Sequence, residues 1–157
     1  MALSMYLRNQ FHTGYAVRDV DRAIATLSDR LGVTRWKIIR LPADAPGTAL
    51  AFAHTGNMMM ELIGAKPGGL DFYNDWIPDD PAVLQVHHHG YYAQDRAEFD
   101  AIRDQFVAQG FAMVIDADMP GILNYRYFDT AKALGHYTEF VLLQPGGEAF
   151  FGDVPRN

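Results

Sequence analysis

The chain has 157 residues, of which 49% are hydrophobic and 20% are charged, and its formal net charge is −6. This length suits about one domain, and the composition is that of a folded protein rather than a disordered chain. The negative charge argues against a nucleic-acid or anionic-membrane partner, because such surfaces bind clustered Lys and Arg. Without cysteine there are no disulfides, cysteine-ligated zinc sites or thiol catalysis. No signal-like N-terminus or membrane-length apolar run is visible, so we expect a cytoplasmic protein.

The first half of the chain predicts a β-α-β-β-β order. After a strand at 11–17, Asp19 is placed to cap a helix that ends at Gly32. The predicted apolar stripe of this helix is Ile24, Leu27 and Leu31. Three further strands are expected at 36–40, 49–54 and 58–63. We assign residues 10–66 to module one and 67–86, which are rich in Pro and Gly, to a connection.

The second half repeats this order, so we assign 87–147 to module two. A strand at 88–93 precedes a helix that begins with the capping pair Asp95 and Glu98 and ends at Gly110. The apolar face of this helix is predicted to be Phe99, Ile102 and Phe106. Strands are expected at 111–115, 123–128 and 136–143. The tail, 148–157, is expected to be either poorly ordered or a docking arm.

The two halves also match in sequence. HTGYAVRD at 12–19 aligns with HHGYYAQD at 88–95, and ELIGAKPGG at 61–69 aligns with EFVLLQPGG at 139–147. Two copies of one pattern, each with a His, a Gly, an Asp and then a Glu before Pro-Gly-Gly, indicate a tandem duplication.

The repeat singles out four polar side chains. Because side chains alternate along a strand, His12, Glu61, His88 and Glu139 are expected to meet on one concave face, with Gly14 and Gly90 leaving room beside the histidines. A carboxylate in the middle of a buried strand is costly unless it is paired or coordinated. Two imidazoles and two carboxylates suit a divalent ion such as Zn, Ni, Co, Mn or Fe(II).

The remaining histidines are not predicted ligands. His87 and His89 flank His88 and point to the other face by the same alternation, so we interpret them either as structural residues or as residues that support the metal ligands from behind. His54 and His136 have no counterpart in the repeat and stay unassigned.

With these motifs the chain resembles the vicinal oxygen chelate superfamily, which contains glyoxalases, bleomycin-resistance proteins and extradiol dioxygenases. The matching segments are FHTGYAVRD at 11–19, MELI at 60–63, HHGYY at 88–92 and LGHYTEFV at 134–141. The resemblance implies an α+β fold in which two tandem β-α-β-β-β modules form a cup-shaped, partly open barrel around a divalent metal ion. It also implies a homodimer.

Position by position, the four polar residues match the His-Glu-His-Glu ligand order of bacterial-type glyoxalase I and related epimerases. The extradiol dioxygenases lack an acid at the position of Glu61. The signature segments of a glutathione-using glyoxalase I are missing, so we do not expect glutathione thioester chemistry. The segment LGHYTEF resembles a glyoxalase-like subgroup.

Our first functional hypothesis is a lyase, isomerase or epimerase acting on a small oxygenated substrate through a metal-stabilised enolate. Glu139 or Glu61 is the base, and Glu139 is preferred. Candidates for an aromatic substrate wall are Tyr92, Tyr137, Trp76 and Tyr127, with Tyr15 and Tyr125 in addition. The alternatives are an Fe(II) ring-cleaving dioxygenase that uses His12, His88 and Glu139, and a non-enzymatic protein that binds a small molecule or antibiotic.

Overall fold

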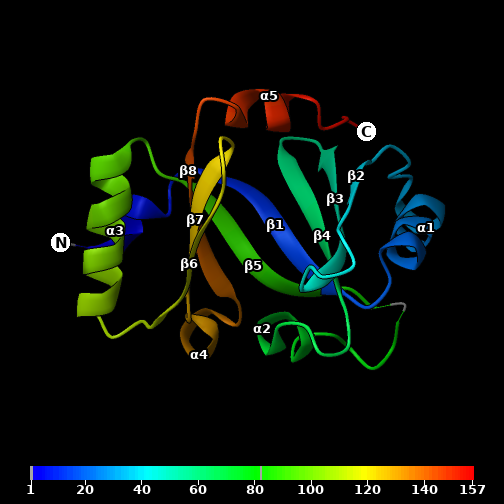
Figure 1. The fold of residues 1–157 in the computed structure, drawn as a ribbon, viewed down its shortest axis with the longest axis horizontal. Coiled ribbons are helices and arrows are strands. Elements are labelled where there is room, and N and C mark those ends of the chain that lie inside the picture. The colour runs from blue at the N-terminus through cyan, green and yellow to red at the C-terminus, as the bar shows by residue number, and fades with distance from the viewer. Residues whose placement is uncertain (1, 82) are drawn as a thin grey trace. The chain divides into compact units, whose positions relative to one another are not determined.

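The computed structural model describes residues 2–81 and 83–157, and its helices and strands follow the order of two β-α-β-β-β modules (Figure 1). The chain divides into two compact units. Unit 1 contains the residues up to His12 together with His88–Asp153, and unit 2 contains Thr13–His87 and Val154–Asn157. The strand β1 (Gln10–Val17) contributes its first three residues to unit 1 and its remainder to unit 2.

In unit 2 the strand order is β2-β3-β4-β1. Its elements after β1 are α1 (Val20–Leu31), β2 (Lys37–Arg40), β3 (Gly47–Thr55), β4 (Met58–Ala65) and α2 (Asp71–Asn74). β3 pairs antiparallel with both β2 and β4. All three predicted strands of this module are present, and β3 and β4 each extend two residues beyond the predicted hairpin.

The helix α1 begins and ends where the sequence predicts. The Asp19 carboxylate accepts a hydrogen bond from the backbone N–H of Arg22 at 3.0 Å, and Gly32 ends the helix with φ of 70°. The predicted apolar stripe is wrong at Leu31, whose side chain is 70% exposed. The left-handed turn brings Val33 into the core instead, because its N–H bonds to the carbonyl of Leu27 and the two side chains share one cluster.

In unit 1 the strand order is β1-β5-β8-β7-β6. Its elements are η1 (Leu3–Tyr6), β5 (Gln85–Tyr92), α3 (Arg96–Ala108), β6 (Met113–Met119), β7 (Leu123–Phe128), α4 (Ala131–Leu134), β8 (Tyr137–Leu143) and α5 (Gly147–Gly152). β8 is parallel to β5 on one side and antiparallel to β7 on the other. In Figure 1 the helix α3 stands beside the sheet of this unit.

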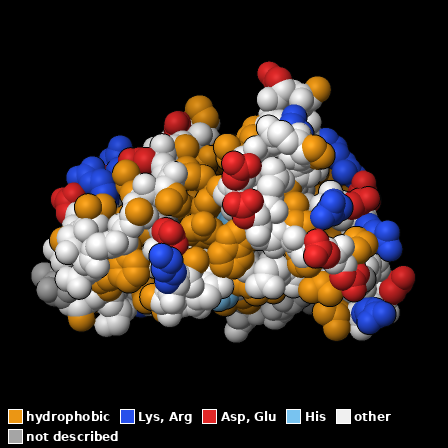
Figure 2. Space-filling view, turned by 90° about the horizontal axis from the view of Figure 1, so that it is seen from below, with side chains coloured by type: hydrophobic (Ala, Val, Ile, Leu, Met, Phe, Trp, Pro, Cys, Tyr) orange, Lys and Arg blue, Asp and Glu red, His pale blue; other side chains and the backbone are white. Residues whose placement is uncertain are grey.

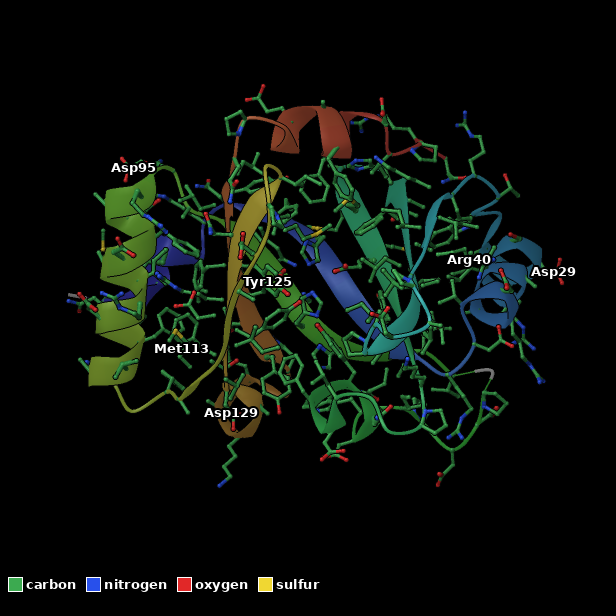
Figure 3. All side chains as sticks on the ribbon, in the orientation of Figure 1. Asp29, Arg40, Asp95, Met113, Tyr125 and Asp129 are labelled. Carbon is green, nitrogen blue, oxygen red and sulfur yellow. The ribbon has the colours of Figure 1, made fainter. Side chains whose placement is uncertain are left out.

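The predicted capping pair starts α3, as Figure 3 shows for Asp95. Asp95 accepts a hydrogen bond from the backbone of Glu98 at 2.8 Å, and the Glu98 carboxylate accepts one from the backbone of Gln94 at 2.7 Å. The predicted apolar face is confirmed, because Phe99, Ile102 and Phe106 are all buried. They pack in one cluster with aromatic residues of β7 and β8.

The strand predicted at 111–115 starts later, since β6 begins at Met113. Gly110 adopts φ of 86°, and the backbone N–H of Phe111 bonds to the carbonyl of Phe106 at 3.0 Å. This turn places the Phe111 ring 5.7 Å from the Phe106 ring, so Phe111 belongs to the end of the helix rather than to the strand.

The tail forms α5 and then docks on unit 2 as an arm (Val154–Asn157). Val154 is buried, and the carbonyl of Pro155 accepts a hydrogen bond from the N–H of His54 at 2.8 Å. The Asn157 side chain accepts hydrogen bonds from the backbone N–H groups of Thr34 and Arg35, both at 2.9 Å. Of the two expectations for this segment, the structure shows the docking arm.

The surface carries charges of both signs. On the face shown in Figure 2, Lys and Arg side chains alternate with Asp and Glu rather than gathering in one region. One exposed ion pair joins Arg40 of β2 to Asp21 of α1 at 2.5 Å, and Figure 3 labels its arginine. Among the described residues, no helix is both long and apolar enough to cross a membrane.

Candidate metal centre

Three of the four predicted ligands converge in unit 1. His12 comes from β1, His88 from β5 and Glu139 from β8, and all three side chains are buried. The Nε2 atoms of the two histidines lie 2.8 Å apart. Oε2 of Glu139 lies 3.0 Å from Nε2 of His12 and 3.6 Å from Nε2 of His88. Each residue therefore directs one electron-pair donor at the same small volume.

The strand register explains this convergence. In the parallel pair of β5 and β8, His88 lies opposite Tyr137 and Gly90 lies opposite Glu139. A Cβ on Gly90 would overlap the imidazole ring of His12, so the glycine provides the space in which that ring sits. The expectation that a glycine makes room beside a histidine is confirmed at this position.

The chemistry of the three donors fits a divalent cation. In the described part of the chain, Oε2 of Glu139 is buried and accepts no hydrogen bond, although it is close to both imidazoles. A buried carboxylate oxygen without such a bond carries a large desolvation cost that coordination removes. Two histidines and one carboxylate are a known ligand set for divalent transition metals. These three residues would hold the ion.

Burial also sets the protonation state of His88. Desolvation lowers the pKa of His88 to about 3, and it outweighs the nearby Glu139 carboxylate, which acts in the opposite direction. The imidazole is therefore neutral near pH 7, which is the form that coordinates a metal ion.

Tyr127 of β7 adds a fourth polar group. It lies directly opposite Glu139 in the antiparallel pair of β7 and β8, and it is buried. Its hydroxyl is 3.3 Å from Nε2 of His88, and the two rings meet edge to face at 5.0 Å. The sequence suggested Tyr127 only as part of an aromatic wall. Its proximity to a ligand atom depends on the β7–β8 register, which no single-strand pattern predicts.

The structure places the other predicted site residues as follows. Glu61 lies in unit 2, half-buried on β4 and opposite Phe52 of β3. Trp76 also lies in unit 2, with its ring 5.7 Å from the His87 ring. Tyr137 starts β8 beside the ligand strand β5. The roles of Glu61, Trp76 and Tyr137 stay predictions.

The neighbouring histidines have structural contacts. His87 is fully buried, and its Nε2 lies 2.9 Å from the carbonyl of Phe72 in a cage of aromatic rings. Nδ1 of His89 lies 3.0 Å from the amide nitrogen of Gln10, and its ring meets that of His136 at 4.2 Å. The structure therefore uses both flanking histidines of the HHH run in packing and hydrogen bonding.

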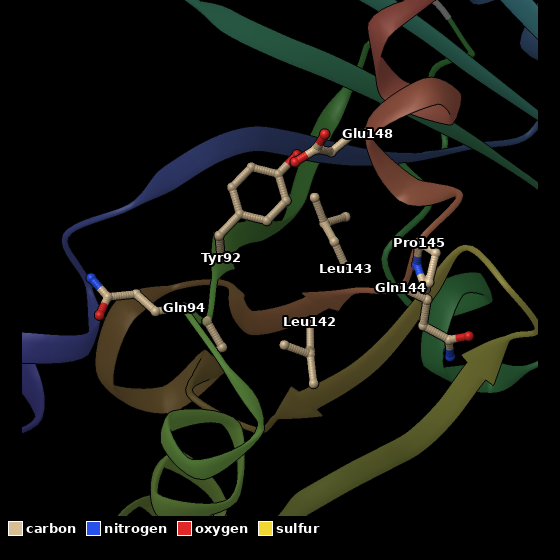
Figure 4. A pocket seen from close by; sticks show the side chains of 8 residues that line it. Tyr92, Gln94, Leu142, Leu143, Gln144, Pro145 and Glu148 are labelled. Atoms are coloured by element: carbon tan, nitrogen blue, oxygen red, sulfur yellow. The ribbon is translucent and has the colours of Figure 1, made fainter.

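Tyr92, on the strand β5 that also carries His88, lines a pocket of about 590 Å³. The pocket lies between the ends of β5 and β8 and the start of α5. Figure 4 shows Tyr92 and Glu148 pointing toward one another across it, with Leu142 and Leu143 beside them. Burial, and secondarily the Glu139 carboxylate, raises the pKa of Tyr92 to about 12, so the phenol is neutral at physiological pH.

Comparisons with known proteins agree with this fold. The family model for the glyoxalase/bleomycin resistance protein/dioxygenase superfamily matches residues 11–128, a range that contains His12, Glu61 and His88 and ends before Glu139. No curated protein matches the chain.

Several solved structures are similar in fold. A hypothetical protein from Bacillus halodurans is 18% identical with a TM-score of 0.62, covering 87% of this chain and 94% of that one. Methylmalonyl-CoA epimerase from Mycobacterium tuberculosis is 19% identical with a TM-score of 0.61, covering 90% and 91%. Methylmalonyl-CoA epimerase from Streptomyces coelicolor, in complex with 2-nitronate-propionyl-CoA, is 15% identical with a TM-score of 0.62, covering 86% and 94%.

The family match spans most of the chain, and the order of elements is that of two β-α-β-β-β modules. The predicted α+β fold and the predicted superfamily are both confirmed. The chain belongs to the glyoxalase/bleomycin resistance protein/dioxygenase superfamily.

Proposed function

We propose that the protein is a metal-dependent enzyme of the lyase, isomerase or epimerase type, which removes a proton next to a carbonyl group of a small oxygenated substrate. The observation that carries this proposal is the convergence of His12, His88 and Glu139 on one buried volume. The similarity in fold to methylmalonyl-CoA epimerases is consistent with it. We also propose that the protein is a homodimer, which sedimentation analysis tests.

In this proposal the ion and the surrounding side chains have separate roles. A bound ion supplies Lewis-acid stabilisation of the negative charge that develops on a substrate oxygen. Glu139 accepts the substrate proton on its carboxylate, and Glu61 is the alternative base and the fourth ligand. The Tyr127 hydroxyl, close to the His88 ligand atom, is placed to donate a hydrogen bond to a substrate oxygen. Tyr92, Tyr137 and Trp76 form the aromatic wall.

The decisive experiment measures metal content by elemental mass spectrometry after purification without an affinity tag. We expect near-stoichiometric Zn, Ni, Co or Mn in the wild type and a much lower metal content in Glu139→Ala, because that variant lacks one of the three converging ligands. The matched control is Asp29→Ala, which removes an exposed carboxylate of α1 (Figure 3) and leaves metal content unchanged. Wild-type protein that binds none of these ions, even after reconstitution, would refute the proposal.

One observation favours a second candidate, an Fe(II) ring-cleaving dioxygenase. The group in unit 1 consists of two histidines and one carboxylate, which are the ligand types that non-haem Fe(II) oxygenases use. Glu61→Gln separates the two candidates, because Glu61 is a ligand or base only in the first. Oxygen consumption with catechol that survives Glu61→Gln favours the dioxygenase. Loss of metal or of isomerase activity in that variant favours our first proposal.

A further inference from the structure

The sheet face that carries Glu139 continues beyond the candidate metal centre. β8 and β7 pair in an unbroken antiparallel register, and Tyr127 lies directly opposite Glu139. Two residues further along, Tyr125 lies opposite Val141, and alternation places this pair on the same face. Opposed residues on one face have Cβ atoms about 5 Å apart, and the next such pair along the strands is about 7 Å away. A ligand held at Glu139 therefore reaches Tyr125 and Val141 once it extends by a few atoms along the strands.

Contacts on both sides of β7 establish which of its residues share this face. The Arg126 guanidinium lies over the Phe99 ring of α3 and donates a hydrogen bond to the carbonyl of that residue. Arg126 therefore faces α3, and alternation turns Tyr125 and Tyr127 to the opposite side. The 3.3 Å contact between the Tyr127 hydroxyl and Nε2 of His88 agrees with this assignment. Figure 3 shows Tyr125 on the side of β7 away from α3, so it shares a face with the candidate metal ligands.

The edge strand β6 separates its charged side chains from its apolar ones. Its register with β7 is unbroken from Ile115 to Met119. The Asp116 carboxylate accepts a hydrogen bond from Arg126, so Asp116 and, by alternation, Asp118 lie on the α3 face. The β6 residues on the other face are apolar and partly exposed: Ile115, Ala117 and Met119. Within β6, β7 and β8, every charged side chain other than Glu139 therefore lies on the face away from the metal ligands.

The apolar residues on the metal-ligand face are separate from the packing beneath α3. In the described part of the chain, the hydrophobic cluster of α3 does not include Ile115, Ala117 or Tyr125. Ligand sites combine apolar walls with a few polar groups that fix orientation, and here an apolar surface adjoins Glu139. An apolar group of a ligand gains affinity by covering such a surface. A charged group there would lose its hydration without gaining a partner of opposite charge.

We propose that this face of β6–β8 binds an uncharged, apolar group of the substrate, while the substrate's oxygens bind at the metal centre. The apolar surface is formed by four residues in two neighbouring cross-strand rows: Ile115, Ala117, Tyr125 and Val141. The inference rests on the proposed function and narrows it to substrates that join an oxygenated end to an apolar end. Ala117 has the smallest side chain of the four, so a charged replacement there changes which substrates fit. Ala117 is therefore a specificity-determining residue.

Calorimetric titration of zinc-loaded protein with two hydroxamates tests the proposal. Acetohydroxamate and hexanohydroxamate present the same pair of oxygens to a metal ion, but hexanohydroxamate carries four more methylene groups. Each methylene that leaves water strengthens binding by up to about fourfold. We therefore expect hexanohydroxamate to bind about tenfold to a hundredfold more tightly than acetohydroxamate. Adipic acid monohydroxamate has a similar chain that ends in a carboxylate, and it should lose most of this gain.

Substitutions on β6 and β7 assign the preference to the apolar surface. Ala117→Asp should reduce the ratio of the two affinities to about one and leave zinc content and acetohydroxamate affinity unchanged. The matched control, Val114→Asp, adds the same charge at an exposed residue of β6 and should keep the wild-type ratio. If Ala117→Asp does not fold, Tyr125→Ser decides the question, because it removes a ring from the same surface and should lower the ratio by about threefold or more.

The outcomes separate this inference from the proposed function. If the wild type takes up no zinc, the proposed function fails and the inference fails with it. If zinc binds but the two hydroxamates bind equally, or if their ratio survives Ala117→Asp, the inference alone is overturned. A carboxylated probe that binds as well as hexanohydroxamate also overturns it. So does an affinity for hexanohydroxamate that removal of zinc with a chelator leaves unchanged, because the oxygens of the probe would then not be bound at the metal centre.

Discussion

Gly90→Ala tests how the His12 ring is packed without replacing any of the candidate metal ligands. A Cβ at position 90 would overlap three atoms of the His12 ring, while the backbone there is an ordinary strand that accepts alanine. Forcing a group into a packed interior costs about 1–3 kcal/mol. Alanine is otherwise favoured over glycine in a strand by about 0.5–1 kcal/mol. We therefore expect metal-free Gly90→Ala to lose about 0.5–2 kcal/mol of unfolding free energy, together with much of its metal affinity, because the His12 ring must move.

The His12→Ala background provides the control. Without the imidazole, the same Gly90→Ala change should become neutral or stabilising by up to about 1 kcal/mol. The assay is urea denaturation of the four proteins of this cycle, all stripped of metal, followed by the fluorescence of their two tryptophans. If Gly90→Ala costs the same with and without the His12 ring, the steric relation between these two residues is refuted.

Three other predictions concern the metal, a buried cation and pH. A divalent ion at 100 times its dissociation constant should raise the unfolding free energy of the wild type by about 2.7 kcal/mol, and Glu139→Gln should lose most of this increase in the same denaturation assay. Arg126→Met should lower the unfolding free energy by about 2 kcal/mol, because the buried guanidinium donates hydrogen bonds to Asp116, Asp100 and the carbonyl of Phe99. The control Arg103→Met removes an exposed ion pair and should change the unfolding free energy by less than about 0.5 kcal/mol. Burial, and to a lesser extent the charge of Arg156, lowers the pKa of His54 below 6.5. As the pH drops below about 6.5, His54 is protonated more readily in the unfolded chain than in the folded one, so the unfolding free energy should fall. His54→Gln should flatten this part of the plot of stability against pH, and an unchanged plot would contradict the assignment.

The internal repeat made much of the fold and part of the site predictable. It predicted His12, Glu61, His88 and Glu139 as one group, of which His12, His88 and Glu139 converge in unit 1, and it predicted that a glycine at position 90 makes room beside a histidine. Local signals were equally effective at helix ends, where Asp19 and Asp95 cap as expected. These features depend on nearby residues and on strand alternation, which a sequence displays directly.

Features that depend on contacts between distant segments could not be predicted from the sequence. The sequence gives no sign that Arg126 would sit buried over the Phe99 ring, because a single arginine in a strand is normally solvent-facing. For the tail the sequence left a poorly ordered segment and a docking arm as alternatives, and it did not predict that Asn157 would bind backbone groups more than a hundred residues away. Leu31 fits the helical period, but the turn after Gly32 substitutes Val33 in the core.

The way in which the three donors are distributed along the chain bears on how the protein folds. His12, His88 and Glu139 come from strands far apart in sequence, and β5 and β8 are parallel, so a hairpin cannot bring them together. Long-range parallel pairing forms slowly, because the chain entropy lost in closing large loops is recovered only when the contacts are complete. An unfolded or half-folded chain therefore does not bring His12, His88 and Glu139 together as one chelating group. Metal uptake would mark the end of folding in this protein rather than its start.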